Sequence, residues 1–368
     1  MKVRLGDVCD KASSSIIQKS LEGHEGKYPI YGASGLIKYV DFYQREKPYI
    51  AVVKDGAGIG RVMKLPAYSS VISTMQYIIP NEKVDINYLV YSMEYMNLAK
   101  YFSGATIPHI YFRDYQKEPL NLPEIKVQKK IGGILSNIEK LIAFRNQELS
   151  KFDQLVKSRF IELFGDPVSN DKFWNLAILQ DVTSKIGSGA TPKGGKSSYQ
   201  KEGIPFIRSM NVHDGVFLSK DLAYLSDKQA KQLENVIVKE NDVLLNITGA
   251  SVARSCIVPK TVIPARVNQH VSIIRCIPKY LNPEFLNKLF LHHRYKNLLL
   301  SLGEAGGATR QAITKSQLEK LQIILPPLTL QNEFADFVQQ VDKSKLAVQK
   351  SLEKLEILKK SLMQQYFG

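Results

Sequence analysis

The sequence predicts an α+β protein with two like globular domains, each followed by one long helix, and a pseudo-two-fold internal repeat. The first observation is that Gly104-Ala105-Thr106 recurs as Gly307-Ala308-Thr309, an offset of 203 residues (104 to 307). The second is a heptad-like apolar pattern near the end of each copy. The third is the length of 368 residues, which suffices for two separate cores.

The repeat continues without a gap to the last residue. At the same offset the paired segments are Leu122-Pro123 and Leu325-Pro326, Gln128 and Gln331, and Phe164-Gly165 and Phe367-Gly368. A weaker match upstream, at an offset of 193 (56 to 249), aligns Gly56–Arg61 with Gly249–Arg254 and Gln76 with Gln269. The unit is far longer than a solenoid or propeller period, so it indicates a duplicated domain plus helix.

Composition points to a polyanionic partner. The chain has 50 Lys+Arg against 35 Asp+Glu, a net charge of +15, which is typical of nucleic-acid binding; a merely basic protein is the alternative. Cys9, Cys256 and Cys276 form no CxxC spacing and fit a reducing compartment. Without a signal-like start or a membrane-spanning apolar run, we expect a cytoplasmic protein with no membrane partner.

The first globular region, residues 1–122, is predicted to be mixed. Tyr49–Val53 and Tyr77–Ile79 are β-prone, and Ile86–Phe102 is predicted as a helix. Gly56–Gly60 suggests a dinucleotide loop, but the following Arg61–Pro66 is strand-like rather than helical. We therefore interpret the glycines as a tight hairpin turn.

The second globular region, residues 166–326, follows the same plan. Strands are predicted at Asp242–Leu245 and His270–Ile274, and a helix at Pro283–Leu302 with proline in its first turn. Ala190–Ser197 satisfies a relaxed phosphate-loop pattern, but Val182–Gly187 before it is poor for a buried strand and no amphipathic helix follows. A basic loop that contacts DNA phosphates is the better interpretation.

The two long helices are predicted at residues 123–165 and 327–368. Apolar residues recur in steps of four and three from Ile131 to Leu163 and from Phe334 to Tyr366. Helices of this length extend about 55–60 Å at 1.5 Å per residue. If a two-fold relates the halves, the helices run antiparallel as a coiled coil, and the globular domains lie at opposite ends.

Four polar residues interrupt this apolar pattern. Arg145 and Arg159 in the first helix, and Lys345 and Lys359 in the second, stand where the other copy is apolar. Such mismatches can select pairing of the two helices with each other. Alternatively, these long side chains lie at the edge of the apolar stripe, the seam along which the helices would pack, and extend their charged ends into solvent.

The residues favour no catalytic site, and we expect no catalytic residue, metal or cofactor in this chain. His292 and His293 are adjacent on a predicted helix and point in different directions, so they are expected to be exposed or capping residues rather than ligands. Glu124-Ile125-Lys126 resembles part of a nuclease motif but has no paired carboxylate. A fused methyltransferase or NTPase is the enzymatic alternative.

Several segments together resemble the specificity (S) subunit of Type I restriction-modification systems, HsdS. They are Tyr28–Ile37, Ser188–Pro192 with Gly203–Arg208, Asn268-Gln269-His270, Gly307–Ile313 and Ser158–Pro167. The first copy departs from the pattern at Ile107-Pro108-His109, where the second has Arg310-Gln311-Ala312. The resemblance implies target-recognition domains at residues 1–122 and 166–326, and spacer helices at 123–165 and 327–368.

The same resemblance implies the partners. The chain would have no activity of its own and would bind double-stranded DNA and two modification (methyltransferase) subunits, which carry S-adenosylmethionine. Restriction (motor-nuclease) subunits would bind through them, and the complex would recognise a bipartite, asymmetric target. A coiled-coil scaffold that binds proteins without recognising DNA sequence is the alternative function.

Candidate DNA contacts are basic and polar side chains in the predicted loops. They are Tyr31, Ser34, Lys38, Lys54, Arg61, Thr191, Lys193, Lys196, Arg208, Asn211, Arg254 and Arg310. Arg208 is the preferred base contact because Ile204–Ile207 would hold it at the end of a strand. A structural ion pair is the alternative for this arginine.

If the helices set the distance between two recognition domains, deleting about one heptad from both should shorten the unread gap of the target. Neither half-site should change, because the domains themselves are untouched. Sequencing of methylated sites in cells measures both quantities, and an unchanged gap would contradict the spacer role.

Overall fold

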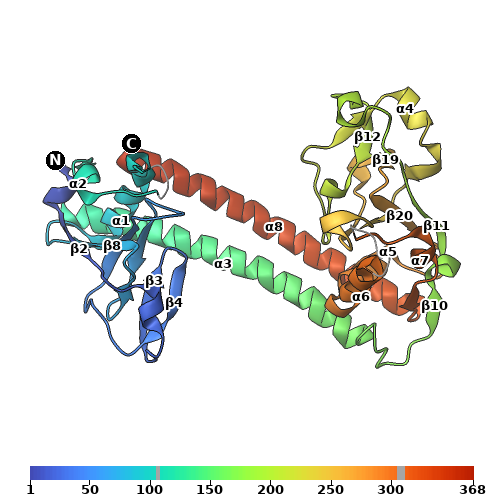
Figure 1. The fold of residues 1–368 in the computed structure, drawn as a ribbon, viewed down its shortest axis with the longest axis horizontal. Coiled ribbons are helices and arrows are strands. Elements are labelled where there is room, and N and C mark those ends of the chain that lie inside the picture. The colour runs from blue at the N-terminus through green and yellow to red at the C-terminus, as the bar shows by residue number, and fades with distance from the viewer. Residues whose placement is uncertain (105–107, 305–310) are drawn as a thin grey trace. The chain divides into compact units, whose positions relative to one another are not determined.

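The computed structural model describes residues 1–104, 108–304 and 311–368 (Figure 1). It is a mixed helix and sheet protein with two long helices, α3 (Ile125–Phe164) and α8 (Leu328–Phe367), each of 40 residues. Both follow the Leu-Pro pairs and end at Phe, as predicted. The chain forms two compact units: unit 1 is Met1–Glu148 with Val348–Gly368, and unit 2 is Leu149–Ala347. The repeated Gly-Ala-Thr segments fall largely outside the described residues.

Unit 1 is built on two small sheets. One has the antiparallel order β2 (Cys9–Ser13), β8 (Met75–Pro80), β5 (Tyr49–Val53) and β6 (Val62–Leu65). The other has the order β4 (Gly35–Val40), β3 (Tyr28–Gly32) and β7 (Ser70–Val71). The remaining elements are β1 (Lys2–Arg4) paired with β9 (Pro119–Asn121), and helices α1 (Ile86–Tyr95) and α2 (Phe112–Tyr115).

Unit 2 repeats this plan with additions. Its first sheet has the antiparallel order β11 (Thr183–Ser188), β20 (Val271–Cys276), β17 (Val243–Asn246) and β18 (Ser255–Ile257). The second has the order β15 (Ala223–Leu225), β12 (Ile204–Ile207), β19 (Ala265–Val267) and β16 (Ile237–Val238). Two strand pairs are β10 (Leu176–Ile178) with β21 (Gln322–Ile324), and β13 (Val212–His213) with β14 (Val216–Phe217). The helices are α4 (Asp227–Lys231), α5 (Pro283–Leu291), α6 (His293–Glu304) and α7 (Lys315–Glu319).

The predicted strands are confirmed in position, but two predicted helices differ from the structure. The helix predicted at Ile86–Phe102 ends at Tyr95, and Asn97 is left-handed with φ 51°. The helix predicted at Pro283–Leu302 is broken at His292, which is extended between α5 and α6. The prediction that Val182–Gly187 is poor for a buried strand is confirmed: residues 183–187 belong to β11, which lies at a sheet edge and buries few of its side chains.

The break at His292 has a packing reason. The imidazole of His292 is half-buried and stacks on Phe160 of α3, with ring centroids 5.9 Å apart, and the residue is the C-cap of α5, one of the two roles predicted for it. Burial and the neighbouring His293 lower its pKa. Turning the chain at His292 lets α5 and α6 each place a hydrophobic face in the unit 2 core, which periodicity in the sequence does not reveal.

A buried glutamine attaches each long helix to its unit. In unit 1, Gln128 Oε1 accepts from the backbone N–H of Asp85 at 2.9 Å, and its Nε2 donates to the carbonyls of Pro123 and Lys83. In unit 2, Gln331 repeats the pattern with the N–H of Asn282 and the carbonyls of Pro326 and Tyr280. Asp85 and Asn282 are the N-caps of α1 and α5. The repeated Leu-Pro and Gln thus join helix to domain.

Within each unit, segments of α3 and α8 lie side by side (Figure 1). In unit 2, Lys345 pairs with Asp153 at 2.6 Å and Arg159 with Glu333 at 2.8 Å, which makes the two segments antiparallel. In unit 1, Lys359 pairs with Glu139. Three of the four polar seam residues therefore contact the other helix.

Arg145 differs, because its partner is Glu148 of the same helix, at 2.6 Å. The three interhelical pairs support the interpretation that these polar residues match one helix to the other. Each core combines domain and helices: unit 1 buries Leu135 and Met363 with Tyr88, and unit 2 buries Phe160 and Phe334 together.

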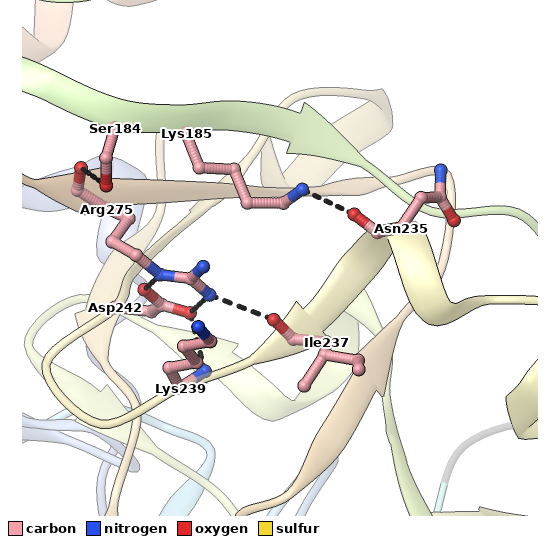
Figure 2. Close-up of polar contacts among 7 residues, drawn as sticks. All are labelled: Ser184, Lys185, Asn235, Ile237, Lys239, Asp242 and Arg275. Carbon is pink, nitrogen blue, oxygen red and sulfur yellow. Dashed lines mark hydrogen bonds and ion pairs between the residues drawn. The ribbon is translucent and has the colours of Figure 1, made fainter.

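An ion pair between the buried Asp242 and the half-buried Arg275 holds one end of the first unit 2 sheet, which contains β17 and β20 (Figure 2). Asp242, which is 0% exposed, accepts two hydrogen bonds from Arg275, at 2.7 and 2.8 Å, and one from the N–H of Lys239 at 2.7 Å. Arg275 also donates to the carbonyl of Ile237 at 2.9 Å. Lys185 beside it donates to the carbonyl of Asn235, and burial followed by the charge of Arg275 lowers its pKa. All four Asp242 and Arg275 bonds are charge-assisted, which joins β17, β20 and β16.

Replacing Gly132 of α3 by alanine should destabilise unit 1. A Cβ there would lie 2.8 Å from Cβ of Asn87 and 2.9 Å from the N of Tyr88, at the start of α1. Overpacking of this kind costs about 1–3 kcal/mol. The matched control is Gly133→Ala, where no atom lies within 4 Å, and which should raise stability by about 0.5–1 kcal/mol through helix propensity. Urea unfolding followed by circular dichroism measures both; equal effects would contradict the close approach.

Asp242→Asn should lower the free energy of unfolding of unit 2 by about 3 kcal/mol, because it leaves the Arg275 guanidinium without its countercharge. Glu240→Gln is the control: Glu240 pairs with Lys260 in an exposed ion pair and should cost less than about 1 kcal/mol. Trp174, the single tryptophan, packs on the unit 2 core and reports its unfolding by fluorescence. A cost for Asp242→Asn no larger than the control would refute the role of this pair.

Candidate nucleic-acid interface

Two hairpin turns occupy the same place in the two units. The turn between β5 and β6 is closed by the N–H of Gly60 on the carbonyl of Val53 at 2.8 Å, and the turn between β17 and β18 by Ala253 on Asn246 at 2.9 Å. Gly60 and Ala253 both have positive φ, 78° and 64°. The prediction that Gly56–Gly60 forms a hairpin turn is confirmed; its counterpart in unit 2 keeps the first glycine, Gly249 (φ 76°), and has Ser251 and Ala253 in place of the other two.

In each unit, the turn is hydrogen-bonded to a second loop, and the two second loops correspond to each other in the repeat. The N–H of Gly56 donates to the carbonyl of Pro108, and that of Gly249 to the carbonyl of Gln311, both at 2.9 Å. Asp55 and His109 form an isolated bridge, as do Thr248 and Ala312. The turn residues correspond at the offset of 193 and the loop residues at the offset of 203, and corresponding residues contact each other in both units. The duplication thus extends to individual hydrogen bonds.

In unit 1, three predicted residues gather at this turn. Arg61 donates from Nη1 to the carbonyl of Ala33 at 2.7 Å, which brings the β5–β6 turn to the β3–β4 turn and its exposed Ser34. Lys54 precedes the turn and pairs with Asp55 at 2.6 Å. Asp55 also pairs with His109 from the second loop. The result is a polar surface made by three segments.

The other two predicted residues of unit 1 lie farther along the strands. Tyr31 is half-buried on β3, and burial followed by the neighbouring Tyr39 raises its pKa. Lys38 on β4 donates to the carbonyl of Leu21 at 3.3 Å. These contacts hold Lys38 toward the body of the unit rather than the turn.

In unit 2, Thr191 and Lys193 are exposed on the loop that follows β11. This loop is followed by only a short 3-10 turn, Gly195–Ser198, so a phosphate loop opening an α-helix is absent from this described segment. Arg254 is half-buried at the end of its turn. Two predicted contacts, the side chain of Lys196 and the whole of Arg310, lie outside what the structure describes.

Arg208 follows β12, as predicted, and the described residues give it no ion pair. Its Nη2 donates to the carbonyl of Asp221, and the guanidinium lies over the ring of Tyr199 at 5.5 Å. The partner is therefore a carbonyl and a ring rather than an ion pair. The Nε of Arg208 is buried and has no hydrogen-bond partner among the described residues.

The prediction of Asn211 as a DNA contact is wrong. Its side chain is 0% exposed, and its Nδ2 donates to the carbonyls of Leu218 and Lys220 while its Oδ1 accepts from the N–H of Arg208. The asparagine uses its donors and acceptor to shape the loop that carries Arg208. A sequence pattern cannot separate such a loop-building amide from a ligand-binding one, since both are polar residues in loops.

The alignment of Gln76 with Gln269 is also wrong. Strand pairing places Gln76 opposite Val52 and Ser272 opposite Leu245. Because Val52 and Leu245 correspond at the offset of 193, the counterpart of Gln76 is Ser272, three residues beyond Gln269. Gln76 is buried and accepts from the hydroxyl of Tyr115 at 2.9 Å, whereas Gln269 is exposed in the turn before β20.

Three residues that the sequence did not single out as contacts belong to this surface. Gln269 accepts a hydrogen bond from Thr191, its Nε2 lies 3.2 Å from Nε2 of His270, and Nδ1 of His270 contacts Oγ1 of Thr248. Two of them, Gln269 and His270, stand in Asn268-Gln269-His270, one of the segments that carry the family resemblance. The turns and loops at this end of unit 2 are thus linked by side chains.

The described residues offer little for catalysis. Burial raises the pKa of the free thiols of Cys9, Cys256 and Cys276 to about 12, so they stay protonated and inert. Within residues 1–104, 108–304 and 311–368, no group of His, Cys, Asp or Glu could hold a metal ion. No helix in this part of the chain is long and apolar enough to cross a membrane.

The fold is that of known structures. A specificity subunit of the type I system of M. genitalium superposes over 100% of this chain and 96% of its own, with a TM-score of 0.70 at 14% identity. A chain from a type I restriction-modification system, solved in work on complex assembly and conformational transition, superposes with a TM-score of 0.56 at 18% identity, over 100% of this chain and 97% of its own.

Sequence comparison agrees with the fold. The type I restriction enzyme MjaVIII specificity subunit of Methanocaldococcus jannaschii is 24% identical, over 98% of this chain and 90% of its own length. The model of the type I restriction modification DNA specificity domain matches residues 1–152 and 172–358. With most of the sequence matched, the resemblance is confirmed: the chain belongs to the family of type I restriction-modification DNA specificity proteins.

Proposed function

We propose that this chain is the DNA-recognition subunit of a Type I restriction-modification enzyme and that each unit recognises one half of a bipartite, asymmetric target. The observation that carries the proposal is the shared turn-and-loop frame, held by equivalent backbone bonds in both units. Backbone bonds leave the side chains free to differ. The chain itself is proposed to be non-catalytic and to act in the cytoplasm.

The side chains on this frame differ between the units. The turn in unit 1 carries Lys54, Asp55 and Arg61, with His109 from the second loop. Unit 2 carries Thr248 in place of Asp55 and keeps only the arginine, Arg254. Since base edges are distinguished by their donor and acceptor patterns, two different surfaces favour two different half-sites.

The proposed contacts are the exposed or half-buried side chains among the predicted residues, at the turns, on nearby loops or, for Tyr31, on strand β3. They comprise Tyr31, Ser34, Lys54 and Arg61 in unit 1, and Thr191, Lys193, Arg208 and Arg254 in unit 2. Lys38, Lys196 and Arg310 stay in the proposal on their charge alone. The net charge of +15 supports attraction to the phosphate backbone, which positions the protein before bases are recognised.

The long helices are proposed to bind two modification subunits, which would carry S-adenosylmethionine, and through them the restriction subunits. Both helices expose large apolar side chains: Leu141 is 45% and Phe144 61% exposed on α3, and Ile357 is 69% exposed on α8. Exposed apolar residues of this size at helical spacing are typical of protein interfaces. The same residues would serve the alternative function, a scaffold that binds proteins without recognising DNA sequence.

Sequencing of modified bases in host DNA, with and without this gene, tests the proposal. Loss of methylation at one bipartite, gapped motif is the expected result. To separate the two units, the turn of unit 2 is then altered alone: only one half of the motif should change. If the gene leaves all methylation unchanged although its modification partner is expressed, the scaffold function gains support.

Lys193→Ala should weaken binding of the assembled complex to every DNA sequence alike. Removal of one phosphate contact lowers the slope of log K against log salt concentration by about one unit. Lys260→Ala is the control, because that ammonium already pairs with Glu240 and should leave the slope unchanged. Fluorescence anisotropy over a salt series measures both slopes. A loss of affinity confined to one target sequence would mean that Lys193 contacts a base.

A further inference from the structure

An exposed glutamine in unit 2 is held by its neighbours at both ends of its amide. Gln269 lies in the turn before β20, and Oγ1 of Thr191, from the loop after β11, donates to its Oε1. Its Nε2 faces Nε2 of His270 at 3.2 Å. Nδ1 of His270 in turn contacts Oγ1 of Thr248 in the β17–β18 turn. The four side chains form one chain of hydrogen bonds across three segments.

With the amide of Gln269 in this orientation, its Oε1 accepting from Thr191, the direction of the remaining bonds follows. An amide Nε2 can only donate, so Nε2 of His270 must accept and carries no proton. The proton of the neutral imidazole is then on Nδ1, from which it is donated to Oγ1 of Thr248. The amide of Gln269 thus sets the tautomer of His270, and the hydroxyl of Thr248, which can accept as well as donate, satisfies Nδ1.

Hydrogen bonds also hold the backbone of the turn that carries Gln269 and His270. The N–H of His270 donates to Oδ1 of Asn268 at 3.0 Å, and its carbonyl accepts from Ile247 at 2.9 Å. Asn268 is only 5% exposed, and its own N–H and carbonyl bond to Ile207 and Gly189. The turn that carries Gln269 is thus bonded to three neighbouring segments, so the amide is oriented before any ligand arrives.

Each amide atom of Gln269 keeps unused capacity. Among the described residues, Oε1 has one partner and can accept a second hydrogen bond, and Nε2 has one partner and a second N–H. One donor beside one acceptor matches the major-groove edge of adenine, which presents the acceptor N7 and the donor N6. Guanine presents two acceptors there, and cytosine a single donor, so neither satisfies both amide atoms.

We propose that Gln269 is a specificity-determining residue that recognises an adenine in the half-site of unit 2. Its Nε2 donates to N7 and its Oε1 accepts from N6 of the base. Thr191, His270 and Thr248 are positioning residues, which hold the amide in the orientation that this pair of bonds needs. The inference rests on the proposed function, because it presupposes that this end of unit 2 meets the major groove.

The test uses the full chain assembled with its modification subunits. Once the wild-type motif is known, binding is measured to duplexes in which each base pair of the unit 2 half-site is replaced in turn. In the wild-type complex, one A·T position should discriminate by about 5- to 150-fold, the range of one bidentate contact. Gln269→Ala should abolish discrimination at that position and leave the other half-site unchanged. Gln269→Glu should move the preference there toward C·G, because a carboxylate accepts from cytosine N4.

Two further variants separate recognition from folding. Thr248→Val removes only the hydroxyl that orients His270 and should reduce discrimination at the same position. Gln232→Ala, at an exposed glutamine after α4, should change nothing. The inference is overturned if Gln269→Ala keeps discrimination at every position, or if its losses are uniform along the half-site. A wild-type complex that recognises no bipartite motif would instead overturn the proposed function.

Discussion

The bond between each long helix and its globular unit is the constraint on which the rest of the structure depends. A 40-residue helix leaves a unit in a direction set by its first turns, and Gln128 and Gln331 fix those turns with three hydrogen bonds each. Both amides are almost fully buried, 1% and 0% exposed. A buried amide that lost its partners would leave several backbone groups unsatisfied, which makes other attachments costly. Gly132, one turn after Gln128, removes the side chain that would separate α3 from α1.

The backbone frame of each unit is thus held independently of the side chains proposed to contact DNA. The turns at the candidate interface are built from backbone bonds that recur in both units, and the side chains on them share little. In unit 1 the carboxylate of Asp55 pairs with Lys54 and with His109, whereas in unit 2 neutral groups form a chain of hydrogen bonds. Variation in these side chains therefore costs the fold little and changes the chemistry presented to a ligand.

The polar residues of unit 2 also show how similar groups take different roles. Asp242 is buried and pairs with the half-buried Arg275, and the pair stabilises one end of a sheet. Asn211 is buried and satisfied by the backbone of its own loop. Gln269 is exposed and only partly satisfied within the described residues. Burial and unused hydrogen-bonding capacity, rather than residue type, distinguish the structural amide from the one that can bind.

Several features of the fold could be predicted from the sequence because they depend on the type and spacing of residues alone. The duplication, the long helices after Leu-Pro, their ends at Phe-Gly, the hairpin at Gly56–Gly60 and the basic character are all periodicities, turn residues or counts. Packing decided the rest. His292 breaks a helix because its ring lies on Phe160, 132 positions earlier in the chain, and strand register, not sequence spacing, makes Ser272 the counterpart of Gln76. Asn211, predicted as a contact, is buried and Gln269 is exposed, because burial is set by segments distant in sequence. A sequence lists donors and acceptors, but only the tertiary structure shows which are already paired.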